Sequence, residues 1–242
     1  MNTAHGREDA ELMWLELTEA GIGAFANGNL KTSTQRWTKA SEAAALFDED
    51  DPRRAASLNN LAVSHRFRND NDEAERCYRL ALNAWDDAKR WADNMQVSVR
   101  ARSSLFHLRL ERKHRELYRQ AFIDKHRGLL DAGRAATLNN LAELSQYRGG
   151  TSDATRLFQR ALDLRAGCLN EDDEGVAVIR QNLASISGVS HKPGRVIATR
   201  FRERARRKRW IFDEPPEFTD EGRLMAAILL TQVIGLAPRV GG

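Results

Sequence analysis

Apolar and small residues recur along this chain at helical spacing, in two stretches that match each other closely. Residues 55–82 read AASLNNLAVSHRFRNDNDEAERCYRLAL and residues 135–162 read AATLNNLAELSQYRGGTSDATRLFQRAL, aligned without a gap at an offset of 80. In the first stretch Leu58, Leu61 and Ala62 lie at i, i+3 and i+4, which is one stripe of an α-helix. A polar turn follows, and an alanine–aromatic–alanine pattern marks a second helix. Each stretch therefore predicts two helices joined by a turn.

A ladder of aromatic residues shows that the underlying unit is half of that offset. The four aromatics are separated by 41, 40 and 40 residues, and each is followed three positions later by alanine: Trp37, Tyr78, Tyr118 and Phe158. The sequence predicts helix pairs at about residues 14–47, 55–87, 95–128 and 135–168, and a partial fifth from residue 174, where Asn182 begins another Asn-Leu-Ala. An isolated pair cannot bury its apolar face, so stability has to come from stacking neighbouring pairs.

This pattern of leucine and a small residue on the first helix, then alanine–aromatic–alanine on the second, resembles the tetratricopeptide repeat. The period is longer than the ~34 residues of the commonest form and is similar to the variant found in kinesin light chains. The resemblance implies an all-α, right-handed superhelical solenoid of antiparallel helix pairs over about residues 1–190. It also implies that the first helices line a concave face, where a partner protein or peptide binds.

Asparagines beside the packing leucines are the candidate groove residues, because an asparagine side chain offers a donor and an acceptor to an extended backbone. The candidate partner-binding residues are the recurring Asn60, Asn140 and Asn182, with Arg100 at the equivalent position of the third unit, and, one turn further along, Arg66, Phe67, Gln146 and Tyr147. Two interpretations remain open at this point. The asparagines line a groove, or they bond to neighbouring helices and brace the stack.

The positive charge of the chain is concentrated in one segment. Nine Lys and Arg and one acid (Glu203) lie between Lys192 and Arg209, a local net charge of +8 in a chain whose total is +4, so the remainder carries −4. We expect residues 191–212 to form a degenerate repeat helix. Its basic patch comprises Arg200, Arg202, Arg204, Arg206, Arg207, Lys208 and Arg209. Such a run is typical of a solvated helix face, or of a site for an acidic protein, nucleic acid or anionic membrane.

Residues 213–242 begin with a proline-containing break, DEPPEFTDEGR, and continue with the apolar run LMAAILLTQVIGLA. The run predicts a helix that is apolar almost all round, too short to span a bilayer, and in need of burial. Either it caps the exposed end of the solenoid, or it docks on a partner, a second copy of the chain or a membrane interface.

No constellation of catalytic or metal-binding residues accompanies the repeats. The sequence holds no GxxxxGK[ST], GxGxxG, HExxH, GxSxG or CxxC motif, and the two cysteines, Cys77 and Cys168, have no metal-ligand spacing. There is no basic start followed by an apolar run, so a cytoplasmic location is expected. The chain is therefore predicted to be a non-enzymatic adaptor, scaffold or assembly factor without cofactor or metal. The alternatives are a nucleic-acid-associated regulator using residues 192–209, and a structural subunit held in a complex by the C-terminal helix.

Overall fold

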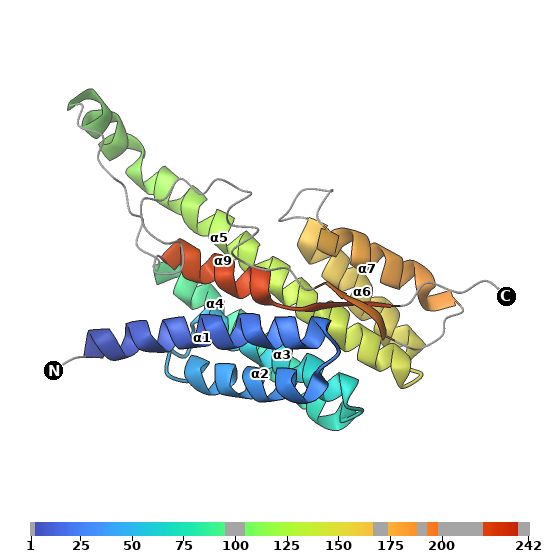
Figure 1. Ribbon diagram of the computed structural model, residues 1–242. Helices are drawn as coiled ribbons and strands as arrows, with labels where there is room; N and C mark the ends of the chain where they lie inside the picture. The colour runs from blue at the N-terminus through green and yellow to red at the C-terminus, as the bar shows by residue number, and fades with distance from the viewer. Residues whose placement is uncertain (1–2, 95–104, 167–173, 188–192, 198–219, 237–242) are drawn as a thin grey trace.

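Helices stacked in antiparallel pairs make up most of the structure (Figure 1). The computed structural model describes residues 3–94, 105–166, 174–187, 193–197 and 220–236. In chain order the elements are α1 (Thr3–Ala26), α2 (Leu30–Ala44), α3 (Pro52–Phe67), α4 (Asn71–Asn94), α5 (Leu105–Tyr147), α6 (Thr151–Ala166), α7 (Glu174–Ala184), the 3₁₀ turn η1 (Ser185–Ser187), β1 (Pro193–Ile197), α9 (Asp220–Leu230) and β2 (Val233–Leu236). The pairs are α1 with α2, α3 with α4, and α5 with α6, and α7 packs on α6.

The turns within the pairs use residues that tolerate a left-handed backbone. Gly28, Asn69 and Gly149 have φ of 74°, 64° and 85° and stand at equivalent positions after the first helix of each pair. Glycine and asparagine adopt this conformation at the least steric cost. Asn29 then caps α2 by accepting a hydrogen bond of 3.1 Å from the Thr32 N–H. The polar turns expected from the sequence are therefore confirmed.

The alanine–aromatic ladder forms the core of the stack. Trp37, Tyr78 and Phe158 are fully buried, and so are the alanines three residues after each of them. Small residues allow the helices to approach closely: a Cβ on Gly21 of α1 would collide with the Trp37 indole of α2. The side chains of Tyr118 and its alanine, the third step of the ladder, lie outside the described residues.

The predicted third and fourth units differ from the structure. The boundary expected between residues 128 and 135 lies inside the single 43-residue helix α5. Gly133, which could have marked a break, instead allows Trp85 of α4 to pack directly against the helix, since a Cβ at Gly133 would lie 2.5 Å from that ring. The second half of α5 thus packs against α3 and α4 without an intervening helix pair.

The C-terminal part also departs from expectation. The predicted helix over LMAAILLTQVIGLA ends at Leu230, and β2 follows as an extended strand. Within the expected basic helix of residues 191–212, residues 193–197 form the strand β1, which pairs antiparallel with β2 (Ile197 opposite Val233). The helix α9 does not cap an end of the solenoid. It lies across α1, α3 and α5, and β2 continues over α5 and α7 (Figure 1). Among the described helices, none is both long and apolar enough to cross a membrane.

Candidate functional site

Five asparagines from three helices form a continuous row on the face of the solenoid that α9 and β2 cover. All of them are completely buried, and we call them the asparagine row: Asn59 and Asn60 of α3, Asn139 and Asn140 of α5, and Asn182 of α7. A buried amide side chain is costly unless its donors and acceptor are paired. The asparagine row is therefore a site at which another part of the chain supplies hydrogen-bond partners.

Those partners are backbone groups of residues 220–236, which we call the C-terminal segment. On α3, Asn60 donates to the Leu230 carbonyl (2.9 Å) and accepts from the Gln232 N–H (2.9 Å). Asn59 donates to the Gln232 carbonyl (3.0 Å). One pair of neighbouring asparagines thus binds the backbone at two alternate residues of the segment.

The pattern continues along the segment onto α5 and α7. Asn140 donates to the Gln232 carbonyl (2.8 Å) and accepts from the Ile234 N–H (2.8 Å). Asn139 and Asn182 both donate to the Ile234 carbonyl, at 2.8 and 2.9 Å. All seven of these hydrogen bonds go to the segment's backbone and none to its side chains.

The asparagines also bond to one another across helices. Asn140 donates to the Asn59 side-chain oxygen (3.0 Å), and Asn182 donates to that of Asn139 (2.7 Å). The two interpretations left open by the sequence are therefore not exclusive in this structure. The same amide groups brace α3, α5 and α7 and hold an extended backbone.

The strand β2 is held along both of its edges. The asparagine row pairs with Gln232, just before the strand, and with Ile234 within it, while β1 runs opposite Val233, Ile234 and Gly235. Backbone groups of successive residues point to opposite sides of a strand. The row consequently takes the place of a neighbouring strand, and β1 supplies the other one.

Charged residues tie the start of the C-terminal segment to the first two repeats. Arg223 forms an ion pair with Glu11 of α1 at 3.1 Å. Glu11 also faces Arg53 (3.5 Å), which in turn pairs with Asp51 (2.6 Å), and these three side chains are almost wholly buried. A buried carboxylate is destabilising without cationic partners, so Arg223 contributes to neutralising this cluster.

Other predicted contact residues have roles in helix packing. Arg66 pairs with Glu143 at 2.9 Å in a buried ion pair between α3 and α5, and its guanidinium lies 3.8 Å from the centre of the Tyr147 ring. Phe67 packs edge-on against Phe25 (4.8 Å between ring centres). Buried ion pairs of this kind position helices and offer no free surface. Arg66, predicted as a partner contact, is therefore corrected to an interior residue, whereas Phe67 is only partly buried.

The remaining predicted site residues divide into two sets. Gln146 is buried, with a side-chain oxygen that has no hydrogen-bond partner among the described residues, and Tyr147 is partly exposed. Arg100 and the basic patch of residues 200–209 lie outside the described residues. Asn59 of α3 bonds directly to Asn140 of α5, so no described helix stands between them at this point.

Sequence reasoning missed four residues of the site. Asn59 and Asn139 were visible as the first member of each Leu-Asn-Asn, and the repeated doublet was the available signal. Neighbouring helical residues differ by about 100° in direction, so only one of each doublet was assigned to the groove. Glu11 and Arg223 carried no signal, because residues 212 positions apart meet only in the fold.

In the described part of the chain, the titratable groups away from the asparagine row do not form a catalytic arrangement. The donor atoms of His65, Glu73 and Cys77 lie within 4.8 Å of one another. Glu73 is bound to Arg76, which lowers the pKa of its carboxyl, and burial raises the pKa of the Cys77 thiol to about 11. A protonated thiol is a poor metal ligand. Burial also raises the pKa of the Tyr78 hydroxyl.

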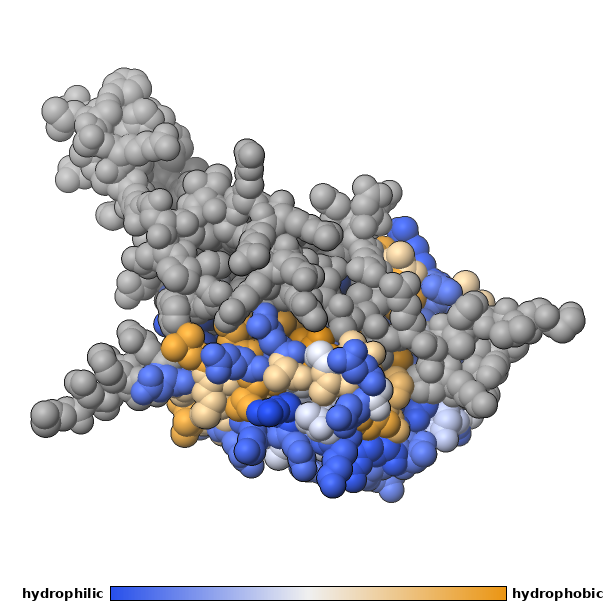
Figure 2. Space-filling view, in the orientation of Figure 1, coloured by the Kyte–Doolittle hydropathy of each residue, from blue (hydrophilic) through white to orange (hydrophobic). Residues whose placement is uncertain are grey.

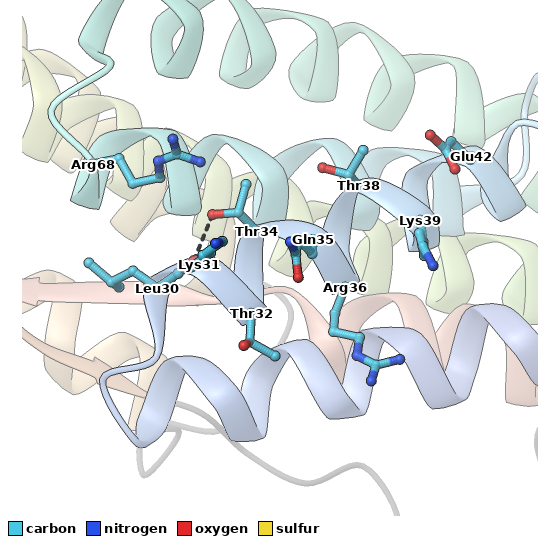
Figure 3. Close-up of a pocket in the computed structure, with 10 residues that line it drawn as sticks. All are labelled: Leu30, Lys31, Thr32, Thr34, Gln35, Arg36, Thr38, Lys39, Glu42 and Arg68. Atoms are coloured by element: carbon cyan, nitrogen blue, oxygen red, sulfur yellow. Dashed lines mark hydrogen bonds between the residues drawn. The ribbon is translucent and has the colours of Figure 1, made fainter.

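The surface of the first repeats carries both polar and apolar side chains. A depression of about 960 Å³ follows α2, and Figure 3 shows Arg36, Lys39 and Glu42 extending from that helix around it. In Figure 2 apolar surface appears among polar side chains on the viewed face, and Leu12 and Met13 of α1 are among the large apolar residues that remain exposed. Neither feature brings together groups that would transform a substrate.

Paired helices with an alanine–aromatic core and a row of buried asparagines define a repeat solenoid. Two family models match, both described as tetratricopeptide repeat, over residues 13–87 and residues 134–173. The chain contains tetratricopeptide repeats, the second match being of the kinesin-light-chain-like type. No curated protein matches the chain. Tetratricopeptide repeats are in general modules for protein–protein interaction.

Proposed function

We propose that this protein is an adaptor, scaffold or assembly factor that binds an extended segment of a partner protein along the asparagine row. The observation that carries the proposal is the set of seven side-chain-to-backbone hydrogen bonds to alternate residues. A site that pairs with N–H and C=O groups recognises an extended backbone as a neighbouring strand would. The C-terminal segment illustrates the chemistry that this site accepts.

A non-enzymatic role agrees with the surroundings of the row. Its polar groups are amides, which have no useful acid or base chemistry near neutral pH. The apolar side chains of the bound segment, such as Leu230 and Ile234, are fully buried against the repeats, so an apolar partner segment gains non-specific affinity in the same way. Binding, rather than group transfer, is the function that these groups support.

The test is affinity capture of the full chain from its native source, followed by mass spectrometry. We compare the natural chain with Asn140→Ala/Asn182→Ala and with the matched control Asn83→Ala, which removes an exposed asparagine from α4. We expect a partner that is captured by the natural chain and the control and lost from the double variant, with all three chains folded by circular dichroism. Equal capture by all three would refute the proposed use of the row.

A further inference from the structure

The asparagine row is already occupied by the chain's own C-terminal segment, and this has a consequence for any partner. We infer that residues 220–236 are a displaceable internal ligand, and that a partner binds by replacing them with a segment of similar form. That form is a short apolar helix followed by an extended strand. This inference rests on the proposed function and specifies how the site is regulated.

The hydrogen bonds of the asparagine row do not depend on the side chains of the segment. Its contacts are with the N–H and C=O groups of Leu230, Gln232 and Ile234, and every residue except proline offers the same groups. Any chain that adopts the same extended course can therefore make the same bonds. The buried Leu230 and Ile234 side chains add a preference for apolar residues at these two positions.

The segment is an imperfect ligand at its centre. Gln232 is completely buried, yet its side-chain oxygen has no hydrogen-bond partner among the described residues. In the described part of the chain, its side-chain nitrogen donates to the carbonyl of Leu230, two residues back in the same segment (3.2 Å). An unpaired buried acceptor weakens binding, and a partner with an apolar residue at this position avoids that loss. We expect roughly tenfold tighter binding from this one replacement.

The C-terminal segment is covalently tethered to β1. Residues 198–219 connect β1 to α9, and a connection of that length reaches at most ~3.3–3.6 Å per residue, or roughly 70–80 Å. The connection is thus long enough for the segment to leave the row, and its departure also breaks the pairing of β2 with β1. A tethered ligand competes at an effective concentration on the order of mM. A free peptide with the same intrinsic affinity would therefore need a concentration on the order of mM to displace the segment. Weak ligands at lower concentrations do not occupy the row.

Release of the segment also removes a positive charge from a buried carboxylate. Departure of α9 separates Arg223 from Glu11, which leaves the buried carboxylate with Arg53 as its nearest described cation. A partner that supplies an Arg or Lys at the position of Arg223 restores the pair. The ligand class is accordingly an apolar helix–strand segment with a basic residue near its start.

The experiment measures binding of a fluorescent synthetic peptide of residues 220–236 to the full chain by fluorescence anisotropy. In the full chain, residues 220–236 compete with the added peptide for the asparagine row. Two substitutions within these residues change how strongly they compete and leave the row itself unchanged. Gln232→Pro removes the N–H that Asn60 accepts from, and should tighten peptide binding at least tenfold. Gln232→Leu removes the unpaired acceptor, and should weaken peptide binding about tenfold. The second variant keeps the test decisive if the first does not fold.

Dependence on the row is checked with Asn140→Ala in the Gln232→Pro background, which should abolish peptide binding. The inference is overturned if the natural chain and both variants bind the peptide equally, or if Asn140→Ala has no effect. A concentration-dependent dimer in light scattering would also overturn it, since the segment would then occupy the row of a second copy. If the partner capture depends on Asn140 but peptide affinity never changes, the proposed function stands and only the displacement inference fails.

Discussion

The Asn140→Ala substitution tests whether the asparagine row holds the C-terminal segment in place. Asn140 accepts from the Ile234 N–H (2.8 Å) and donates to the Asn59 side-chain oxygen (3.0 Å) and the Gln232 carbonyl (2.8 Å). Alanine leaves the Ile234 N–H and the Asn59 oxygen without these partners, whereas the Gln232 carbonyl keeps its bond from Asn59 (3.0 Å). The Asn139 side-chain nitrogen also loses its bond to the Asn140 oxygen (3.2 Å) but keeps the Ile234 carbonyl (2.8 Å), so two buried groups are orphaned and a third loses one of two bonds.

The expected cost follows from that count. Each orphaned buried group costs about 1–3 kcal/mol, so the free energy of unfolding should fall by about 2–6 kcal/mol. Urea denaturation followed by circular dichroism measures this change. The matched control Asn83→Ala, on the exposed face of α4, should alter stability by no more than about 0.5 kcal/mol. A loss below about 1 kcal/mol, or one equal to the control, would refute the reasoning.

Three further predictions concern the packing of the repeats. Gly21→Ala should destabilise the chain by about 1–3 kcal/mol in thermal unfolding, because the added Cβ collides with the tryptophan of α2. Gly23→Ala, two residues along the same helix and with open space around it, should stabilise it by about 0.5–1 kcal/mol, so equal effects would contradict the packing. Arg66→Met should cost about 3–5 kcal/mol in urea denaturation by taking the Arg66 guanidinium away from the buried Glu143 carboxylate, and adding Glu143→Leu should recover most of that loss. In a variant lacking the other cysteine, Cys77 should react slowly with maleimide near neutral pH, since its thiol has a pKa of about 11. Because the unfolded thiol has the ordinary pKa of 9.0 and loses its proton first, the Cys77 contribution to stability should decline between pH 9 and about pH 11, and modification as fast as that of a free thiol would contradict the burial.

Local patterns in the sequence were sufficient for the repeat architecture. The leucine–alanine stripe, the aromatic ladder and the glycine and asparagine turns depend on contacts within a helix pair or between adjacent pairs. Such contacts recur at a fixed period, and a period is visible in one dimension. This is why Trp37, Tyr78 and Phe158 were correctly expected to be core residues. The helix-pair fold class followed from the same information.

The sequence alone did not settle the third unit. Gly133 reads as a helix breaker in isolation, and its structural role depends on Trp85, which lies in another helix. A glycine costs a helix about 1 kcal/mol, and close packing of an indole against its backbone offsets that cost. The uninterrupted α5 therefore follows from a tertiary contact that no local propensity encodes.

The occupant of the groove was likewise decided only in three dimensions. The sequence placed Asn60, Asn140 and Asn182 on one face and identified an apolar C-terminal run, but it gave no reason to bring them together. Asn60 and Leu230 are 170 residues apart when they bond. Backbone N–H and C=O groups are the same in every residue, so a site that binds them leaves no complementary pattern in its ligand's sequence. The sequence is sufficient to predict the repeats because their contacts are periodic. Only the tertiary structure shows that residues 220–236 occupy the asparagine row.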